Sequence, residues 1–140
     1  FSIVRAISAL FNLGNDGKLD SFLSRVVKTL NKEVQAHKKN LETLKFNYDN
    51  AIDELNDNLE DAKEALESSY LNIDINKVDT NEKQTQYVDT YLSNIDNHIL
   101  KVKRIENSIE KEKELYTASV KTTQDQIDSL QLRIETISKQ

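Results

Sequence analysis

Residues 30–48 read LNKEVQAHKKNLETLKFNY, and their apolar or core-compatible side chains recur in alternating steps of four and three residues. An average step of about 3.5 residues keeps these side chains on one narrow stripe of an α-helix, which a coiled coil buries against a partner helix. The stripe consists of Leu30, Val34, His37, Leu41, Leu44 and Tyr48. The stretch therefore predicts a helix that packs along a single seam.

The same spacing extends through most of the remaining sequence. It slips by one four-residue step between Tyr48 and Ile52, continues to Ile73, and returns from Val88 to Ile137. We expect this slip, a stutter, to unwind the supercoil locally without breaking the helix. In the second run, polar side chains occupy three seam positions: Glu106, Lys113 and Thr123. Polar seam residues favour one register over slipped pairings, at some loss of stability.

A short polar segment separates the two runs, and neither run contains a helix breaker. The chain has no proline, and its two glycines, Gly14 and Gly17, lie near its start. Helices joined by about eight residues pack as antiparallel neighbours. The predicted fold is therefore all-α: a long antiparallel coiled-coil helical hairpin with a short apolar N-terminal helix. The predicted segments are the N-terminal helix over residues 1–14 and the hairpin over 15–140, with helices over about 17–73 and 80–138 and a hinge over about 74–81.

The hinge sequence indicates how the chain turns. Asn76 tolerates a left-handed backbone conformation, and Asp79 with Glu82 three residues later resembles a capping box that starts the second hairpin helix. A symmetric hinge centred near residue 77 would place side by side the positions whose numbers add to about 155. This register predicts that Tyr70 lies near Tyr87, in an aromatic cluster at the closed end.

The same register predicts further pairings. It places Leu66 near Tyr91 and His37 near Ala118. It also predicts a charge match across the seam, in which Asp53, Glu54 and Asp57 lie near Lys101, Lys103 and His98. A single continuous helix would forgo these agreements, so they favour the hairpin.

Apolar side chains at the open end of the hairpin, where its first helix begins and its second ends, form a wide stripe. A stripe wider than a two-helix seam requires indicates that a third element packs there. The candidates are residues 1–13 folded back through the Gly14–Gly17 segment, a second chain, and a membrane surface. The predicted interaction surface consists of Phe1, Ile3, Ile7, Leu10, Phe11, Leu19, Phe22, Leu23, Val26, Val27, Leu30, Leu132 and Ile137.

Residues 1–13 favour burial against protein over insertion into lipid. As a helix they would span about 20 Å, whereas a bilayer core is about 30 Å thick. Their apolar side carries Ile3, Ile7, Leu10 and Phe11, and the opposite side offers only Arg5 as a cation. Attraction to anionic lipid would therefore be modest.

Charge is distributed unevenly along the chain, whose net charge is −5. Residues 1–46 hold 8 basic and 4 acidic side chains, residues 47–100 hold 3 and 13, and residues 101–140 hold 8 and 7. A hairpin would thus be acidic at its closed end and mildly basic at its open end. This polarity is either ordinary variation of a solvated surface or a device that directs assembly. The overall acidity argues against nucleic acid as a partner.

No pattern in the sequence points to chemistry. The chain has no cysteine, Gly-rich phosphate loop, His-Glu-x-x-His motif or nucleophile elbow. In the predicted hairpin its two histidines, His37 and His98, would lie about 30 Å apart, and a metal site needs three or four converging ligands. We therefore expect no catalytic, metal-binding or cofactor-binding residue, and we expect that the protein is not an enzyme.

Two classes of function fit these features. The first is a non-catalytic assembly protein, a component of a virion, scaffold or filament, that forms homo-oligomers or binds a protein partner through its open end. The second is a peripheral membrane protein, because the layout of a short apolar helix, a hinge and a long helical hairpin resembles the phage-shock protein A family and its ESCRT-III-like relatives. That resemblance implies an oligomeric membrane coat, although the proline that typically follows the first helix in this family is absent here. A secreted helical toxin is a third alternative. The sequence leaves localisation open among soluble, membrane-peripheral and virion-associated states.

Overall fold

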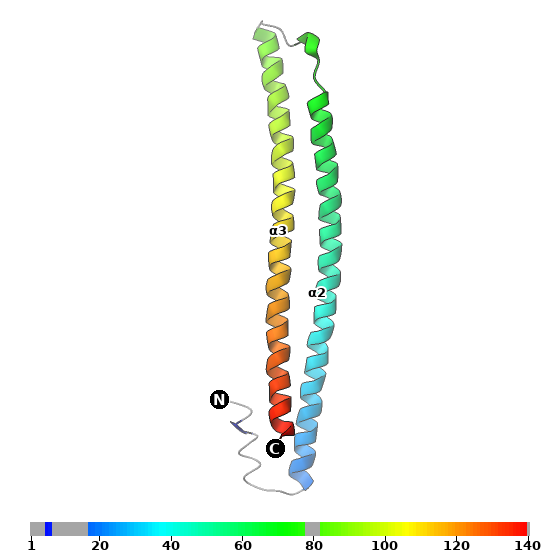
Figure 1. Ribbon diagram of the computed structural model, residues 1–140, viewed down its shortest axis with the longest axis vertical. Coiled ribbons are helices and arrows are strands. Elements are labelled where there is room, and N and C mark those ends of the chain that lie inside the picture. Colours follow the sequence, from blue (N-terminus) through cyan, green and yellow to red (C-terminus); the bar gives the residue numbers. More distant parts are fainter. Residues whose placement is uncertain (1–4, 7–16, 78–81, 140) are drawn as a thin grey trace. The chain divides into compact units, whose positions relative to one another are not determined.

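The computed structural model describes residues 5–6, 17–77 and 82–139. Helix α2 spans Gly17–Leu71, the 3₁₀ turn η1 spans Ile75–Lys77, and helix α3 spans Glu82–Ser138 (Figure 1). α2 and α3 pack against each other, and the described part of the chain contains no strand. The predicted all-α helical hairpin is therefore confirmed.

Some predicted features fall largely or wholly on residues that the structure does not describe. In the predicted N-terminal helix only Arg5 and Ala6 are described, and both are helical. The proposed cap at Gly14 and the first residue of the capping box, Asp79, lie outside the described residues.

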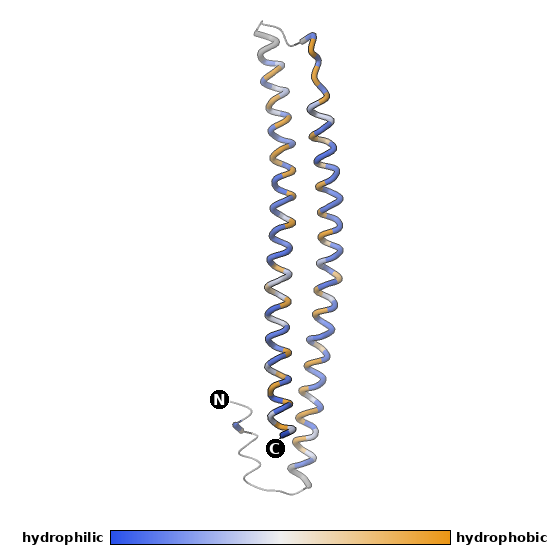
Figure 2. Tube along the Cα trace, in the orientation of Figure 1, coloured by the Kyte–Doolittle hydropathy of each residue, from blue (hydrophilic) through white to orange (hydrophobic). Residues whose placement is uncertain are grey.

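Both long helices follow from the sequence pattern. α2 begins at Gly17 with Asp20 in its first turn, where a carboxylate interacts favourably with the positive end of the helix dipole. α2 also continues without a break through Tyr48 and Ile52, where the heptad pattern slips. Hydrophobic residues recur at intervals along both helices, with hydrophilic residues between them (Figure 2). This intermittent pattern is typical of helices that bury one stripe.

The chain divides into two compact units. The open-end unit comprises Phe1–Phe46 with Tyr116–Gln140, and the hinge unit comprises Asn47–Leu115. Each unit buries seam residues of its own; in the hinge unit these include Ala62, Ile95 and Val102.

Two tyrosines of α3 hold the chain at the hinge. The Tyr91 hydroxyl donates a hydrogen bond to the backbone carbonyl of Tyr70, with an O···O distance of 2.8 Å. The backbone N–H of Asp74 donates to the Tyr87 hydroxyl, also at 2.8 Å. These side chains therefore fix the end of α2 and the following connection against the first turns of α3. We refer to the two bonds as the tyrosine clasp.

The clasp shows that the predicted register is wrong. The paired residues, Tyr70 with Tyr91 and Asp74 with Tyr87, have numbers that add to 161 rather than to about 155. The prediction assumed a symmetric hinge, but the chain after Leu71 runs beside the first turns of α3 before it turns back. The midpoint of the hairpin therefore lies later in the chain than the predicted residue 77. In the same register Asp53, Glu54 and Asp57 would face Ser108, Asn107 and Arg104 rather than Lys101, Lys103 and His98. Of the predicted charge match, only a pairing of Asp57 with a basic residue remains.

The turn is also made differently from the prediction for Asn76. None of the described non-glycine residues has a positive φ angle, so Asn76 is not left-handed. Its backbone N–H instead donates to the Asp74 carboxylate, at an N···O distance of 3.1 Å. An Asp side chain that accepts a bond from the residue two positions later mimics a backbone turn, and here it leads into η1.

The tyrosine clasp can be tested by removing one hydroxyl. We expect Tyr91→Phe to lower the free energy of unfolding by about 0.5–1 kcal/mol, because the Tyr70 carbonyl loses its side-chain donor at a solvent-exposed site. Tyr70→Phe is the matched control, since it removes a hydroxyl but keeps the backbone carbonyl that Tyr91 uses. Urea unfolding followed by circular dichroism measures both variants. Equal losses in the two variants would contradict the clasp.

Candidate interaction surface

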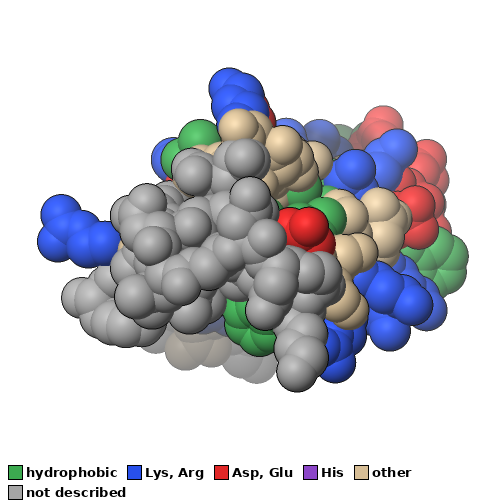
Figure 3. Space-filling model, turned by 90° about the horizontal axis from the view of Figure 1, so that it is seen from below, with side chains coloured by type: hydrophobic (Ala, Val, Ile, Leu, Met, Phe, Trp, Pro, Cys, Tyr) green, Lys and Arg blue, Asp and Glu red, His purple; other side chains and the backbone are tan. Residues whose placement is uncertain are grey.

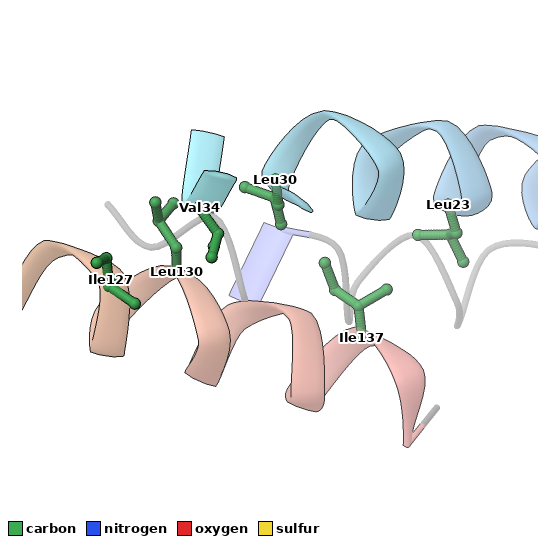
Figure 4. Packing of buried hydrophobic residues seen from close by; sticks show 6 residues of the cluster. All are labelled: Leu23, Leu30, Val34, Ile127, Leu130 and Ile137. Carbon is green, nitrogen blue, oxygen red and sulfur yellow. The ribbon is translucent and has the colours of Figure 1, made fainter. Parts of the chain in front are cut away.

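The open-end unit has a hydrophobic core formed by both helices (Figure 4). Its buried members are Leu23, Leu30 and Val34 of α2 and Ile127, Leu130 and Ile137 of α3. Ile137 lies between Leu23 and Leu30, and Leu130 lies beside Val34 (Figure 4). Facing residues in this unit therefore also have numbers that add to 160 or more, as in the hinge unit.

The residues of the predicted interaction surface have different environments in the structure. Leu23, Leu30 and Ile137 are buried in the core of the hairpin, and Val26 and Val27 pack partly buried against that core. Phe22 and Leu132 are exposed, with 42% and 63% of their surface accessible. The Leu19 side chain and Phe1, Ile3, Ile7, Leu10 and Phe11 lie outside the described residues. Among the described members, only Phe22 and Leu132 are exposed, so this part of the surface is narrower than the predicted stripe.

The exposed apolar surface on α2 includes a shallow groove. The groove has a volume of about 430 Å³, and the described residues that line it are Phe22, Arg25, Val26, Thr29, Leu30 and Glu33. All six lie on α2, at spacings of three and four residues. The groove therefore runs beside the seam that α2 forms with α3, along the row that starts at Phe22. We call it the Phe22 groove.

Sequence analysis did not predict the polar members of this groove. Arg25, Thr29 and Glu33 are outside the heptad seam, so a search for apolar seam positions passes over them. The spacing of Phe22, Val26, Thr29 and Glu33 is the signal that could have identified them, because residues three and four apart share one helix face.

A second hollow lies between the helices of the open-end unit. It has a volume of about 480 Å³, and its lining includes His37 and Glu33 of α2 and Asp125, Gln126 and Arg133 of α3. His37 is half-buried there and faces the segment around Thr122–Gln126, so the predicted neighbour, Ala118, is wrong. Within the described ranges, no group of three or more His, Cys, Asp or Glu side chains is arranged to hold a metal ion.

Surface ion pairs contribute little to this end of the hairpin. Lys121 Nζ lies 3.0 Å from Asp125 Oδ2, and Lys139 Nζ lies 2.7 Å from Glu135 Oε1. The hydrogen bond and positive charge of Lys139 lower the pKa of the Glu135 carboxyl group. Both pairs are exposed and join residues four apart in the sequence, and such pairs have little effect on stability.

Seen from below, Lys and Arg side chains show around the edge of the molecule together with Asp and Glu side chains and patches of hydrophobic ones (Figure 3). The whole open-end unit carries 11 basic and 7 acidic side chains, whereas the hinge unit carries 8 basic and 17 acidic ones. The Phe22 groove is therefore apolar surface in a unit of positive net charge.

Comparison with protein-family models, curated proteins and solved structures finds no significant match for this chain. Among the described helices, none contains a stretch that is both long and apolar enough to cross a membrane. The arrangement of the described side chains is thus the basis for inferring a function.

Proposed function

We propose that this chain is a non-catalytic assembly protein that self-associates through the Phe22 groove, as a component of a virion, scaffold or filament. The observation that carries the proposal is the exposure of Phe22 beside a core that is already closed. The hairpin buries Leu23 and Leu30 against α3, and 42% of Phe22 remains accessible one position away. Apolar surface of this kind gains free energy when a partner removes it from water.

A second copy of the chain is the partner that these features favour. A contact between two open ends would place the Phe22 grooves against each other and bury apolar surface from both. A staggered contact would instead pair the basic open-end unit with the acidic hinge unit of a neighbour. Exposed ion pairs contribute only about 0–1 kcal/mol each, so the apolar contact is the stronger of the two.

Salt distinguishes the two contacts. We expect sedimentation equilibrium to show a concentration-dependent increase in mass that persists in about 1 M salt, where the Debye length is about 3 Å. Apolar burial survives this screening, whereas a staggered contact held by charge dissociates. A chain that stays monomeric up to high micromolar concentration, in low and high salt alike, would contradict self-association.

A peripheral membrane protein is the second candidate, and the positive charge around the apolar groove favours it. Arg25, Lys28 and Lys32 are exposed on the same part of α2 as Phe22. Together they could hold the open end on an anionic lipid surface. Flotation with anionic vesicles and with neutral vesicles tests this alternative. If it holds, the chain floats with anionic vesicles, and its binding to them falls as the salt concentration rises.

A further inference from the structure

The Phe22 groove begins a short distance after an apolar segment of the same chain. Residues 1–13 end four positions before α2 starts at Gly17, and Phe22 is the sixth residue of α2. The intervening residues include Gly14 and no proline. A helix that turned back over this connection would run beside the first turns of α2, where the Phe22 groove lies.

The apolar spacing of the segment matches that of the groove. Phe11, Ile7 and Ile3 are separated by steps of four residues, as are Phe22, Val26 and Leu30. Side chains four residues apart form a ridge on a helix, and two helices pack when such ridges interdigitate. In an antiparallel arrangement Phe11 would lie beside Phe22 and Ile7 beside Val26, and Ile3 would reach the end of the groove at Leu30, most of whose side chain is buried against α3.

The two described residues of the segment agree with this arrangement. Arg5 and Ala6 are helical and belong to the same compact unit as the groove. Arg5 is exposed and Ala6 is half-buried. In a helical segment Ala6 would share a face with Ile3, three positions before it. Partial burial of Ala6 is what this arrangement requires.

We propose that residues 1–13 dock onto the Phe22 groove of their own chain and compete with a second copy for it. This inference rests on the proposed function, because it makes the segment a regulator of self-association. A copy that binds the groove must first displace the segment. Both grooves of a contact must be uncovered, so the apparent dissociation constant equals the intrinsic constant divided by the square of the fraction of chains in which the groove is uncovered.

Docking is tested in the full chain with a pair of cysteines, since the native sequence has none. We expect Ile7→Cys with Val26→Cys to form an intrachain disulfide on oxidation at low protein concentration, detected by mass and by mobility on a non-reducing gel. The control pair is Ile7→Cys with Glu64→Cys, which places the second thiol far along α2 and should not close within one chain. An interchain disulfide, or none, in the first pair would overturn the inference.

Regulation is tested with one charge on either face of the segment. Ile7→Asp places a carboxylate on the apolar face and should release the segment, while Asn12→Asp adds the same charge to the polar face. If the groove is covered in about nine chains of ten, both partners of a groove-to-groove contact pay this penalty, so Ile7→Asp tightens the apparent dissociation constant of self-association about a hundredfold, and Asn12→Asp leaves it unchanged. An unchanged or weaker constant for Ile7→Asp would overturn the regulatory role.

The outcomes of the two measurements distinguish a failure of docking from a failure of the proposed function. If no variant associates at any concentration, self-association is wrong, whereas the disulfide still reports whether the segment docks. If the chain associates and the disulfide forms only between chains, self-association holds and docking within one chain is wrong.

Discussion

Replacing Ile127 with alanine is expected to lower the free energy of unfolding by about 2–4 kcal/mol. Ile127 is the largest fully buried side chain among the described residues, with 2% of its surface accessible. It packs in the core that Leu30 and Val34 contribute from α2. The substitution removes three buried carbon atoms and leaves a cavity that neighbouring side chains fill only in part, and both effects destabilise the fold.

Leu132→Ala is the matched control on the same helix. It removes a side chain of the same size five residues further along α3, but 63% of the Leu132 surface is accessible. We expect a change within about 0.5 kcal/mol, as for most surface substitutions. Urea unfolding followed by far-ultraviolet circular dichroism compares the two variants. A loss for Leu132→Ala as large as that for Ile127→Ala would mean that the faces of α3 are wrongly assigned.

The sequence predicted the helices and the residues of the seam because apolar residues that recur at a regular spacing lie on one face of a helix. Leu30, Val34, Ile127 and Ile137 occupy heptad positions, and all four are buried in the open-end unit. The pattern needs no knowledge of the partner helix, since each helix must turn its apolar stripe toward something. Thr123 also occupies a heptad position and is buried, although it is polar.

The register could not be predicted in the same way, because it depends on the path of the connection. Heptad positions recur every seven residues, so several registers bring apolar side chains together equally well. The tyrosine clasp, in which Tyr87 and Tyr91 bind backbone groups, favours one of these registers. Backbone donors and acceptors leave no trace in the sequence. A tyrosine in the first turns of α3 therefore predicts an aromatic contact but not its hydrogen-bond partner.

The interaction surface was predicted only in part for a related reason. Phe22 and Leu23 are neighbours of similar hydrophobicity, and only the packing of α2 on α3 shows that Leu23 is buried and Phe22 exposed. The wide apolar stripe therefore combined two surfaces, the hairpin core and the row beside it. The Phe22 groove is the part that remains for a partner.

The largest effect on assembly is expected from Phe22→Asp. We expect this substitution to weaken self-association by at least about 100-fold, because truncation of an aromatic anchor alone commonly costs 2 kcal/mol or more and the carboxylate would also be desolvated. The hairpin itself should remain folded, since Phe22 is 42% accessible and lies outside the buried core. Asp in the second turn of α2 is also near the positive end of the helix dipole.

Phe46→Asp is the control for charge and for loss of an aromatic ring. Phe46 lies on the same helix with 67% of its surface accessible, but it does not line the Phe22 groove. Sedimentation equilibrium of the two variants and the native chain compares their dissociation constants at equal salt. A contact between open ends predicts that only Phe22→Asp dissociates. A staggered contact would bring the middle of α2 against a neighbour, so a larger effect of Phe46→Asp would move the interface away from the open end and contradict the role of the groove.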